Sequence, residues 1–387
     1  MIINRGSWRD MRCVATLDEA LRYVRSTGRV CRVSLHEGCD VSLPTAFETD
    51  GTEGAAKQMA KAFLSANYWA APLDLVVIPN ATFLTEQSTV LFPDMRLCEE
   101  LVYGIYGNDD PMIWKSPGLP REITDWYAGN ISSAPTMPGI HALIHPRWHQ
   151  IYTHWFTEGL AALYDQKGSF ELTGKICIPK GPNYQSESLG LADWRAPTLM
   201  TLVEPVYRFE IAILPTHLFA RTWTHPAVIP GLRRFVASIN NRLDISPEPS
   251  GQPIYLSRED ASARKMLNEA ELSAALEEIG YKKIIAGQLS FKQQVVLFSK
   301  TPVLISPHGS GLTNMLFLPE GGQMLELRPM YAGDRGILWD RSYQILAGLL
   351  GHSYGALFYE NQPGDENWEI DIPFTVAKAK QLINSNR

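Results

Sequence analysis

The sequence predicts an α/β protein of two Rossmann-like domains that face each other across a cleft. Its 387 residues exceed what one hydrophobic core usually organises. From residue 254 to the C-terminus, short apolar runs alternate with amphipathic segments, which is typical of an open parallel sheet covered on both faces. The stretch Asp244–Gln252 (DISPEPSGQ) reads as a linker. We therefore expect an N-terminal domain over residues 1–245 and a C-terminal domain over residues 246–387, whose last helix could pack back on the N-terminal domain.

The composition restricts the classes of protein to consider. A hydrophobic content of 45% with 20% charged residues is that of a soluble globular chain, and a net charge of -6 argues against nucleic-acid binding. No apolar run reaches the roughly 18–20 residues that cross a bilayer, and the first ten residues are too polar for a signal peptide. The five cysteines are scattered without a CxxC pair, which indicates reduced thiols. We expect a cytoplasmic protein, with peripheral attachment to the inner face of a membrane left open.

The N-terminal half shows a less regular alternation of patterns. Helical spacing marks Leu17–Val24, Gly54–Asn67, Ile151–Tyr164, Leu199–Leu202 and Val228–Ile239. Strand patterns mark Leu73–Ile78, Ser88–Phe92, Ile140–Ile144, Lys175–Ile178 and Tyr207–Leu214. The many Pro, Gly, Asn and Ser residues between Asp109 and Pro138 predict loops.

Beyond the linker the pattern alternates strictly. Strands are predicted at Ile254–Ser257, Lys283–Ile285, Val303–Ile305, Met324–Leu327 and Tyr354–Tyr359. Helices are predicted at Asn268–Ile279, Phe291–Ser299, Leu312–Leu318, Tyr343–Leu350 and Thr375–Ile383.

The stretch Thr301–Pro329 carries a strand, a glycine turn, a helix and a second strand, which together form a βαβ unit. The turn of such a unit lies at the carboxyl edge of a parallel sheet. Backbone amides freed by Gly309 and Gly311 would point outward there at a helix N-terminus, an arrangement that suits a phosphate. Alternatively, the glycines only let the helix pack close to the sheet.

Three side chains strengthen the phosphate interpretation of this turn. We expect His308, at the carboxyl end of the strand, to face the ligand crevice rather than the core. Thr313 and Asn314 add a hydroxyl and an amide in the first turn of the helix. The structural alternative is simple capping of the helix by Ser310 or Thr313.

A second polar cluster follows the first strand after the linker. Arg258 comes directly after this strand and Arg264 follows six residues later, so the two guanidinium groups could form a fork for a diphosphate. Alternatively, they form surface salt bridges with Glu259, Asp260 and Glu269.

A third cluster lies on the predicted helix in the middle of the chain. His154 and Glu158 stand one helical turn apart and could act as a general base with its orienting carboxylate. A metal site is the alternative, with the nearby histidines as ligands: His141, His145, His149 and His154. The pattern is not HExxH and Pro146 interrupts any single helix through these residues, so we expect no metal.

Glu326 is a carboxylate within an otherwise apolar strand, Leu325-Glu326-Leu327. It could bind ribose hydroxyls, or it could pair with Arg328 at the end of the strand.

These residues together resemble the core of glycosyltransferase family 61. The resemblance rests on motifs between Ile254 and Pro329, namely Ser257-Arg258, Arg264, Asn268-Glu269, Leu289-Ser290-Phe291, Gln294, His308-Gly309-Ser310-Gly311-Leu312-Thr313-Asn314 and Leu325-Glu326-Leu327. Ser310 stands where the family usually has Ala. The segment Ile151–Glu158 is similar to an upstream element of the family, with Ile151 in place of Asn. Residues 1–130 have no counterpart in this comparison.

The resemblance implies a GT-B fold and an inverting, metal-independent glycosyltransferase that needs no cofactor beyond its nucleotide-diphosphate-sugar co-substrate, most often a UDP-sugar. The donor would be held by Arg258, Arg264, Asn268, Glu269, Glu326 and the turn from His308 to Asn314. His154, or else Glu158, would take the proton from the acceptor, a hydroxyl of a glycan, glycolipid or other glycoconjugate. By analogy with bacterial members, capsule or surface-polysaccharide synthesis is the expected setting.

Two other classes stay open at this point. A non-catalytic nucleotide-sugar or glycan-binding protein could keep the phosphate-binding residues on the same scaffold without the base. A metal-dependent hydrolase could use the histidine cluster instead.

Overall fold

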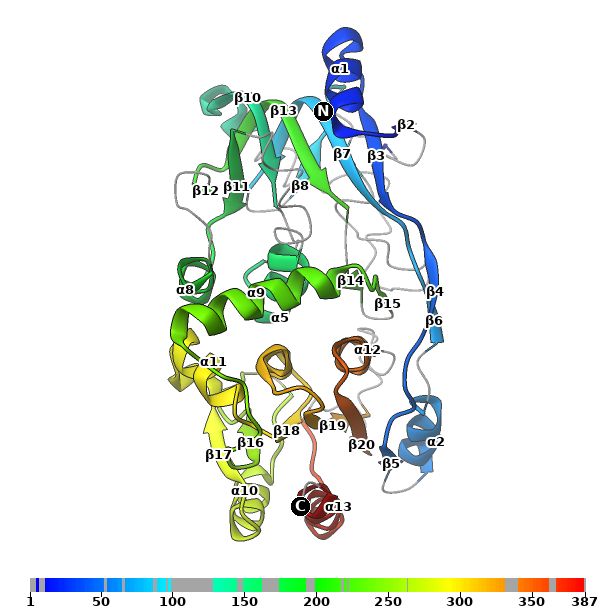
Figure 1. Cartoon of the computed structure of the whole chain (residues 1–387), viewed down its shortest axis with the longest axis vertical. Coiled ribbons are helices and arrows are strands. Elements are labelled where there is room, and N and C mark those ends of the chain that lie inside the picture. Colours follow the sequence, from blue (N-terminus) through cyan, green and yellow to red (C-terminus); the bar gives the residue numbers. More distant parts are fainter. Residues whose placement is uncertain are drawn as a thin grey trace. The chain divides into compact units, whose positions relative to one another are not determined.

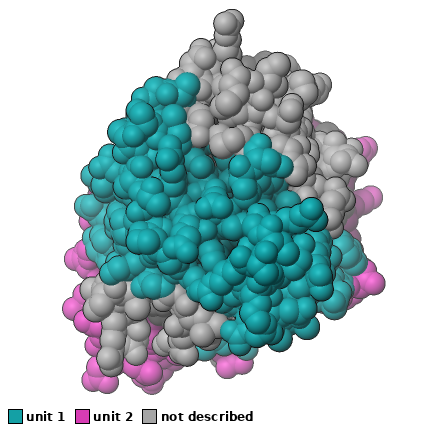
Figure 2. Space-filling model, turned by 90° about the horizontal axis from the view of Figure 1, so that it is seen from above, with its two compact units in different colours: residues 1–39, 69–220, 225–235 teal, residues 40–68, 221–224, 236–387 magenta. Residues whose placement is uncertain are grey.

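A computed structural model of the chain describes residues 5–6, 11–51, 54–64, 67–85, 89–94, 97–98, 128–144, 149–161, 174–192, 199–216, 219–220, 223–262, 264–330, 340–361 and 367–385 (Figure 1). The chain forms two compact units. Unit 1 consists of residues 1–39, 69–220 and 225–235, and unit 2 of residues 40–68, 221–224 and 236–387 (Figure 2). The division falls within helix α9 (Val228–Leu243), and residues 40–68 belong with the C-terminal segment.

Unit 1 is built on a ten-stranded sheet with the order β1-β9-β8-β7-β13-β10-β11-β12, to which β3 and then β2 attach beside β7. Its strands are β1 (Arg5–Gly6), β2 (Arg12–Val14), β3 (Cys31–His36), β7 (Leu73–Leu84), β8 (Thr89–Leu91), β9 (Leu97–Cys98), β10 (Thr136–Leu143), β11 (Lys175–Pro179), β12 (Leu199–Leu202) and β13 (Val206–Pro215). Its helices are α1 (Leu17–Thr27), α5 (Tyr152–His154) and α8 (Asn183–Leu191), with a 3₁₀ turn η1 (Ile131–Ser133) and a π-helical turn η2 (Trp155–Leu160).

The sheet of unit 1 is mixed rather than parallel. Strand β7 runs antiparallel to β3, β8 and β13, whereas β10, β11, β12 and β13 pair in parallel. The short connection from Leu84 to Thr89 allows only an antiparallel return, because a parallel crossover needs a dozen or more residues. The expectation of a parallel Rossmann-like sheet in the N-terminal half therefore holds for the β13-β10-β11-β12 side and for the short pairs β1-β9 and β2-β3, but not for the pairings of β7.

One element of unit 1 differs in type from its prediction. Leu199–Leu202 forms strand β12, which pairs in parallel with β11, and not a helix. Four apolar-rich residues (LMTL) are too few to distinguish the periods of helix and strand, so pairing with β11 decides the conformation.

Unit 2 contains a fully parallel six-stranded sheet with the order β17-β16-β18-β19-β20-β5. The strands are β5 (Glu48–Gly51), β16 (Ile254–Ser257), β17 (Lys282–Ile285), β18 (Val303–Pro307), β19 (Gln323–Pro329) and β20 (Ser353–Tyr359). The helices are α2 (Gly54–Ala62), α10 (Glu269–Glu278), α11 (Phe291–Phe298), α12 (Ser342–Leu350) and α13 (Ile372–Ser385), with 3₁₀ segments η4 (Ala286–Gln288) and η5 (Ser310–Phe317). Every strand and helix predicted after the linker is present, although the segment after the glycine turn is a 3₁₀ helix.

The two faces of this sheet differ in character. One face packs under α10 and α13 through an apolar cluster that includes Val303, Ile305, Leu325, Leu327 and Leu357. Because side chains alternate along a strand, the residues between them point to the opposite face. On β19 these are Glu326 and Arg328, so a buried charged pair lies on the face of the sheet opposite this apolar cluster.

The strand order fixes where a ligand site can form in unit 2. Counted along the C-terminal segment, the order is 2-1-3-4-5, with β5 added at the edge. In such a sheet the order in which strands are added reverses between the first and third strands. Ligands bind outside the carboxyl ends of these two strands. Here those strands are β16 and β18, which end at Ser257 and Pro307.

The remaining short strands, β4 (Cys39–Ser42), β6 (Asn67–Ala70), β14 (Phe219–Ala220) and β15 (Trp223–Thr224), lie in segments where the chain passes from one unit to the other. None of the helices among the described residues has the length and hydropathy of a membrane span. Four described cysteines, Cys13, Cys31, Cys39 and Cys177, are free thiols.

Candidate active site

The glycine turn lies at the carboxyl end of β18 and opens η5. Leu312 N donates to the carbonyl of Gly309, while the backbone N–H groups of Ser310 and Gly311 have no acceptor among the residues that the structure describes. The first N–H groups of a helix lack partners within it and attract anions. The predicted phosphate-binding position of this turn is thus compatible with its geometry.

Arg258 lies beside this turn, brought there by the adjacent strand β16. Its Nη1 donates to the carbonyl oxygen of His308 at 2.5 Å. A Cβ atom built on Gly309 would lie 2.6 Å from Arg258 Nε, so only glycine leaves room for the guanidinium. Gly311 is similarly close to Leu256, whose Cδ2 would lie 2.9 Å from an added Cβ. Both glycines are needed for close packing, and neither has the positive φ that would itself demand glycine.

Arg258 and Arg264 are close enough to interact electrostatically. Burial, and then the charge of Arg264, lowers the pKa of Arg258 from its ordinary value. Among the described residues, no carboxylate forms an ion pair with either guanidinium; Glu259 pairs instead with Lys283 at 2.5 Å. Arg264 also adopts a left-handed backbone conformation (φ 56°), which is uncommon for a residue with a side chain. The salt-bridge alternative for these arginines is therefore not what the structure contains.

Asn268 and Glu269, both predicted to bind the donor, use their polar groups within unit 2. Glu269 Oε1 accepts three hydrogen bonds, from Tyr255 Oη, Ser257 Oγ and Arg258 N, each at 2.8 Å. The amide of Asn268 donates to and accepts from the backbone of Ile370. These two residues shape the end of β16 and the loop beside it.

The residues that follow the turn are also buried. Leu312, Thr313 and Asn314 have no exposed surface. Asn314 Nδ2 donates to Gln294 Oε1 and to the carbonyl of Gly311, both at 3.1 Å. The Asn314 amide thus closes η5 onto α11, and the part of the turn left for a ligand is Gly309 to Gly311.

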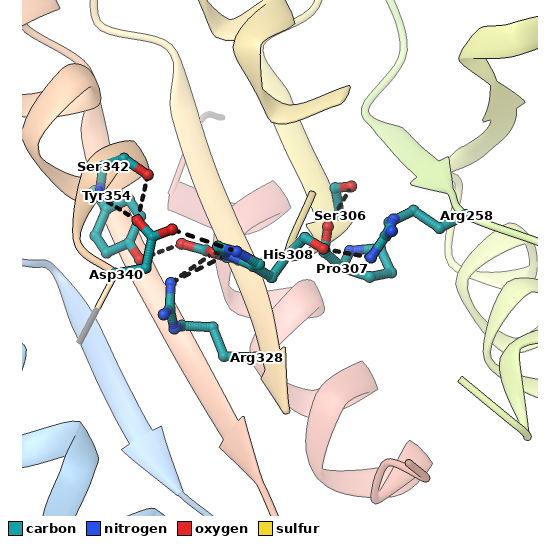
Figure 3. A network of polar contacts seen from close by, with 9 residues as sticks. Arg258, Ser306, Pro307, His308, Arg328, Asp340, Ser342 and Tyr354 are labelled. Atoms are coloured by element: carbon teal, nitrogen blue, oxygen red, sulfur yellow. Dashed lines mark hydrogen bonds and ion pairs between the residues drawn. The ribbon is translucent and has the colours of Figure 1, made fainter. Parts of the chain in front are cut away.

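The imidazole of His308 points into a buried polar network (Figure 3) rather than into an open crevice, and only 6% of the residue is exposed. Its Nδ1 lies 2.5 Å from Glu326 Oε1, and its Nε2 lies 3.9 Å from Asp340 Oδ2. Arg328 Nη1 donates to Glu326 Oε1 at 2.8 Å, and Tyr354 Oη donates to Glu326 Oε2 at 2.5 Å. Asp340 in turn accepts from the backbone N–H and hydroxyl of Ser342.

Burial and charge set the protonation states in this network. Burial lowers the pKa of His308. For Glu326, burial raises the pKa, but the charge of Arg328 and the hydrogen bond from His308 outweigh it and the net shift is downward. For Asp340, too, burial raises the pKa, but the interaction with His308, the charge of Arg328 and the hydrogen bonds from Ser342 outweigh it and the net shift is downward. We take the imidazole as neutral, with its proton on Nδ1 facing the Glu326 carboxylate.

Glu326 therefore pairs with Arg328, one of the two roles expected for it. Both of its oxygens are occupied by protein donors and the side chain is fully buried, which leaves no described oxygen for a ribose. Asp340 and Tyr354 were not anticipated from the sequence. Strand alternation on β20 was the only available signal for Tyr354, since it points to the same face as Glu326 on the neighbouring strand.

In unit 1, the structure brings together the predicted pair at the junction of α5 and η2. His154 Nδ1 lies 2.5 Å from Glu158 Oε1, with 17% of the histidine side chain and 7% of the glutamate side chain exposed. A carboxylate on Nδ1 fixes the tautomer and leaves the lone pair on Nε2, as in a general base with its orienting group. Glu158 lies in the π-helical turn, a geometry that often accompanies functional sites.

The histidines of the metal hypothesis have separate partners. His141 Nε2 contacts the carbonyl of Pro138, and His149 Nε2 contacts the carbonyl of Lys180. His145 lies outside the described residues. Among the residues that are described, no three His, Cys, Asp or Glu side chains come together as a metal site.

Comparison with known proteins finds a family match in the middle and C-terminal parts of the chain. Residues 152–325 match the model of the family described as Glycosyltransferase 61. This part of the chain is a glycosyltransferase family 61 region. The matched range begins at α5 and ends within β19, so it contains the His154–Glu158 pair, Arg258 and the glycine turn.

Several curated proteins are similar to part of this chain. EGF domain-specific O-linked N-acetylglucosamine transferase of Drosophila melanogaster is 35% identical over 129 residues, covering 30% of this chain and 24% of that protein. Beta-1,2-xylosyltransferase XAX1 of Oryza sativa subsp. japonica is 33% identical over 86 residues, covering 22% and 15%. Protein O-linked-mannose beta-1,4-N-acetylglucosaminyltransferase 2 of Homo sapiens is 34% identical over 103 residues, covering 25% and 18%. The matches thus span a quarter or less of these relatives' lengths.

Proposed function

We propose that the chain is an inverting, metal-independent glycosyltransferase whose donor is a nucleotide-diphosphate sugar, namely a UDP-sugar. The observation that carries the proposal is the position of Arg258. Its guanidinium lies at the strand-order reversal of a parallel sheet, against the glycine turn and without an ion-paired carboxylate among the described residues. The match of residues 152–325 to glycosyltransferase family 61 supports the same conclusion.

The proposed donor site neutralises charge with protein groups alone. A sugar nucleotide carries two negatively charged phosphates, and the charge on the leaving diphosphate grows as the bond to the sugar breaks. Arg258 and Arg264 supply two fixed positive charges, and the N–H groups of Ser310 and Gly311 supply hydrogen bonds. Groups fixed in this way stabilise developing charge without reorganisation, which is the role that a metal ion would otherwise take.

The proposed reaction is a single displacement. The acceptor hydroxyl oxygen attacks the anomeric carbon, the bond from that carbon to the diphosphate oxygen breaks, and the configuration at the carbon inverts. A base must take the hydroxyl proton, and we propose Nε2 of His154, with Glu158 stabilising the imidazolium that forms. Glu158 itself is the second candidate for this base.

For the acceptor we propose a hydroxyl of a glycan, glycolipid or other glycoconjugate, in capsule or surface-polysaccharide synthesis on the cytoplasmic side of a membrane. The names of the three relatives describe transfer of N-acetylglucosamine or xylose, so UDP-GlcNAc and UDP-xylose are the first donors to test.

The test measures donor binding and donor turnover separately. Titration calorimetry of the full chain with UDP and UDP-sugars, with GDP as comparison, gives affinity, and nucleotide release with or without simple glycan acceptors gives turnover. We expect Arg258→Ala to weaken nucleotide binding by about tenfold or more, because charge-assisted hydrogen bonds contribute about 1.5–3 kcal/mol. Arg242→Ala, at an exposed arginine of the same unit, is the matched control.

The outcomes separate the alternative classes. Binding without sugar transfer or hydrolysis would identify a non-catalytic nucleotide-sugar-binding protein. Activity abolished by a strong chelator would overturn the metal-independent scheme, and a product that keeps the donor's anomeric configuration, read by NMR, would overturn inversion. A chain that binds no nucleotide would overturn the proposed function.

A further inference from the structure

Residues 40–68 form an arm that belongs to unit 2 although it precedes most of unit 1 in sequence. Its strand β5 pairs in parallel with β20 at the edge of the sheet, and α2 packs on both strands (Figure 1). Phe47 N also donates to the carbonyl of Tyr354 at 2.9 Å. Tyr354 is the residue whose hydroxyl donates to Glu326, so the arm is attached to the strand that carries part of the buried network.

Phe63 connects the arm directly to the network. Its ring is fully buried, with the guanidinium carbon of Arg328 at 4.8 Å and that of Arg341 at 4.9 Å from the ring centroid. Phe358 of β20 packs against it at 5.0 Å, and Gln344 Nε2 donates to its carbonyl at 2.6 Å. An aromatic face attracts a desolvated guanidinium that lies over it. Because two guanidiniums lie near the Phe63 ring, this ring helps to hold both in place.

Contacts lead from Arg328 to the donor turn without interruption. Arg328 donates to Glu326, Glu326 holds His308 Nδ1, and the carbonyl of His308 accepts from Arg258. Arg328 is 1% exposed and Glu326 is fully buried, so each has few alternative positions. A continuous series of contacts therefore joins Phe63 to the guanidinium of Arg258.

We propose that the arm of residues 40–68 is a positioning element for the donor site, with Phe63 fixing Arg328 and, through Glu326 and His308, the orientation of Arg258. Phe63 is a positioning residue in this scheme and contacts no ligand. The proposal rests on the proposed function insofar as the turn binds a nucleotide diphosphate. The arm lies outside the matched range of residues 152–325.

The test compares two equal substitutions in fully buried phenylalanines of unit 2. Phe63→Leu removes the nearer of two aromatic rings beside Arg328, whose guanidinium carbon also lies 5.7 Å from the Phe358 ring centroid. Phe298→Leu removes the same number of atoms from α11, and no guanidinium stacks on Phe298 among the described contacts. We expect both to lower the melting temperature. Only Phe63→Leu should weaken UDP binding, by about three- to tenfold, as for other substitutions that act along a contact network; Phe298→Leu should stay within about twofold. Phe63→Met, whose longer and more flexible side chain adapts to an irregular space, replaces Phe63→Leu if that variant does not fold.

A second measurement reads the network without any ligand. In ¹⁵N-histidine spectra, assigned with His308→Gln, wild-type His308 should be the neutral form with its proton on Nδ1. Phe63→Leu should shift this resonance toward the other tautomer or the imidazolium, whereas Phe298→Leu should leave it unchanged.

Equal loss of melting temperature in the two variants, with unchanged UDP affinity and an unchanged His308 resonance, would overturn the proposal and leave the arm a structural addition. If the wild type binds no UDP or GDP, the proposed function fails, and the His308 resonance alone decides whether the arm positions the turn.

Discussion

The residues that the structure describes include two histidine–glutamate pairs with the same contact and different surroundings. In both, Nδ1 of the histidine lies 2.5 Å from Oε1 of the glutamate. His154 and Glu158 come from successive turns of one helical segment in unit 1, whereas His308 and Glu326 come from neighbouring strands in unit 2. His154 keeps 17% of its side chain exposed, whereas the His308 side chain keeps 7% and its glutamate is also held by Arg328 and Tyr354.

The same pair of residues can thus take part in proton transfer or hold neighbouring groups in one orientation. A base must exchange a proton with a substrate, which requires access and a modest number of competing charges. A histidine enclosed by two carboxylates, an arginine and a tyrosine ring is held in one orientation instead. The greater exposure of His154 supports our proposal that the pair in unit 1 transfers the proton, and the enclosure of His308 supports our proposal that the pair in unit 2 positions the turn.

The largest effect on turnover is expected at the accessible pair. His154→Ala should lower turnover by about a thousandfold, within the range of general base catalysis, while nucleotide affinity and melting temperature change little. Initial rates at saturating donor, together with calorimetric affinity, measure this. A His154→Ala enzyme with wild-type turnover would show that the base is another residue, with Glu158→Gln as the next variant.

Substitutions at the enclosed pair should change the free energy of unfolding more than they change turnover. Arg328→Met removes the cation and leaves Glu326 buried without its charge partner, which should cost about 3 kcal/mol of unfolding free energy. Urea unfolding measures the loss. The double variant Arg328→Met with Glu326→Leu removes both charges and should recover part of it, because a buried pair replaced by apolar groups is often neutral. Failure to recover would mean that Arg328 acts mainly through Phe63.

The sequence predicted unit 2 well because its strands are buried on both faces and read as continuous apolar runs, as in Val303–Pro307. The same logic placed Arg258 and the glycine turn at one sheet edge. The side-chain direction of His308 was not predictable, since a one-residue difference at the end of a strand reverses the face. Pairing of β5 with β20 joins residues some 300 positions apart and leaves no local signal in the sequence.

A smaller, local effect is expected where the enclosed pair meets the donor site. Gly309→Ala places a methyl group 2.6 Å from Arg258 Nε, so the guanidinium must move while the fold can remain. We expect nucleotide affinity to fall by about tenfold, consistent with loss of one charge-assisted contact. Gly190→Ala, where an added Cβ meets nothing within 4 Å, is the matched control and should leave affinity unchanged. Equal affinity in both variants would remove Arg258 from the donor site.

The smallest effect is the dependence of folding stability on pH. It distinguishes the enclosed pair, in which the histidine is neutral, from an ion pair of two charged side chains. The pKa of His308 is lowered by burial from 6.5, and that of Glu326 is lowered from 4.5 because Arg328 and His308 outweigh the opposite effect of burial. For both groups the unfolded chain takes up its proton at a higher pH than the folded protein, so stability is full at neutral pH and falls on acidification. The fall should begin near pH 6.5 through His308 and continue below pH 4.5 through Glu326.

Urea midpoints from pH 8 to pH 4 test this pH dependence. His308→Gln should flatten the upper part of the curve of stability against pH while leaving the lower part unchanged. A wild-type midpoint that is constant between pH 7 and pH 5 would mean that His308 is not held as the neutral imidazole.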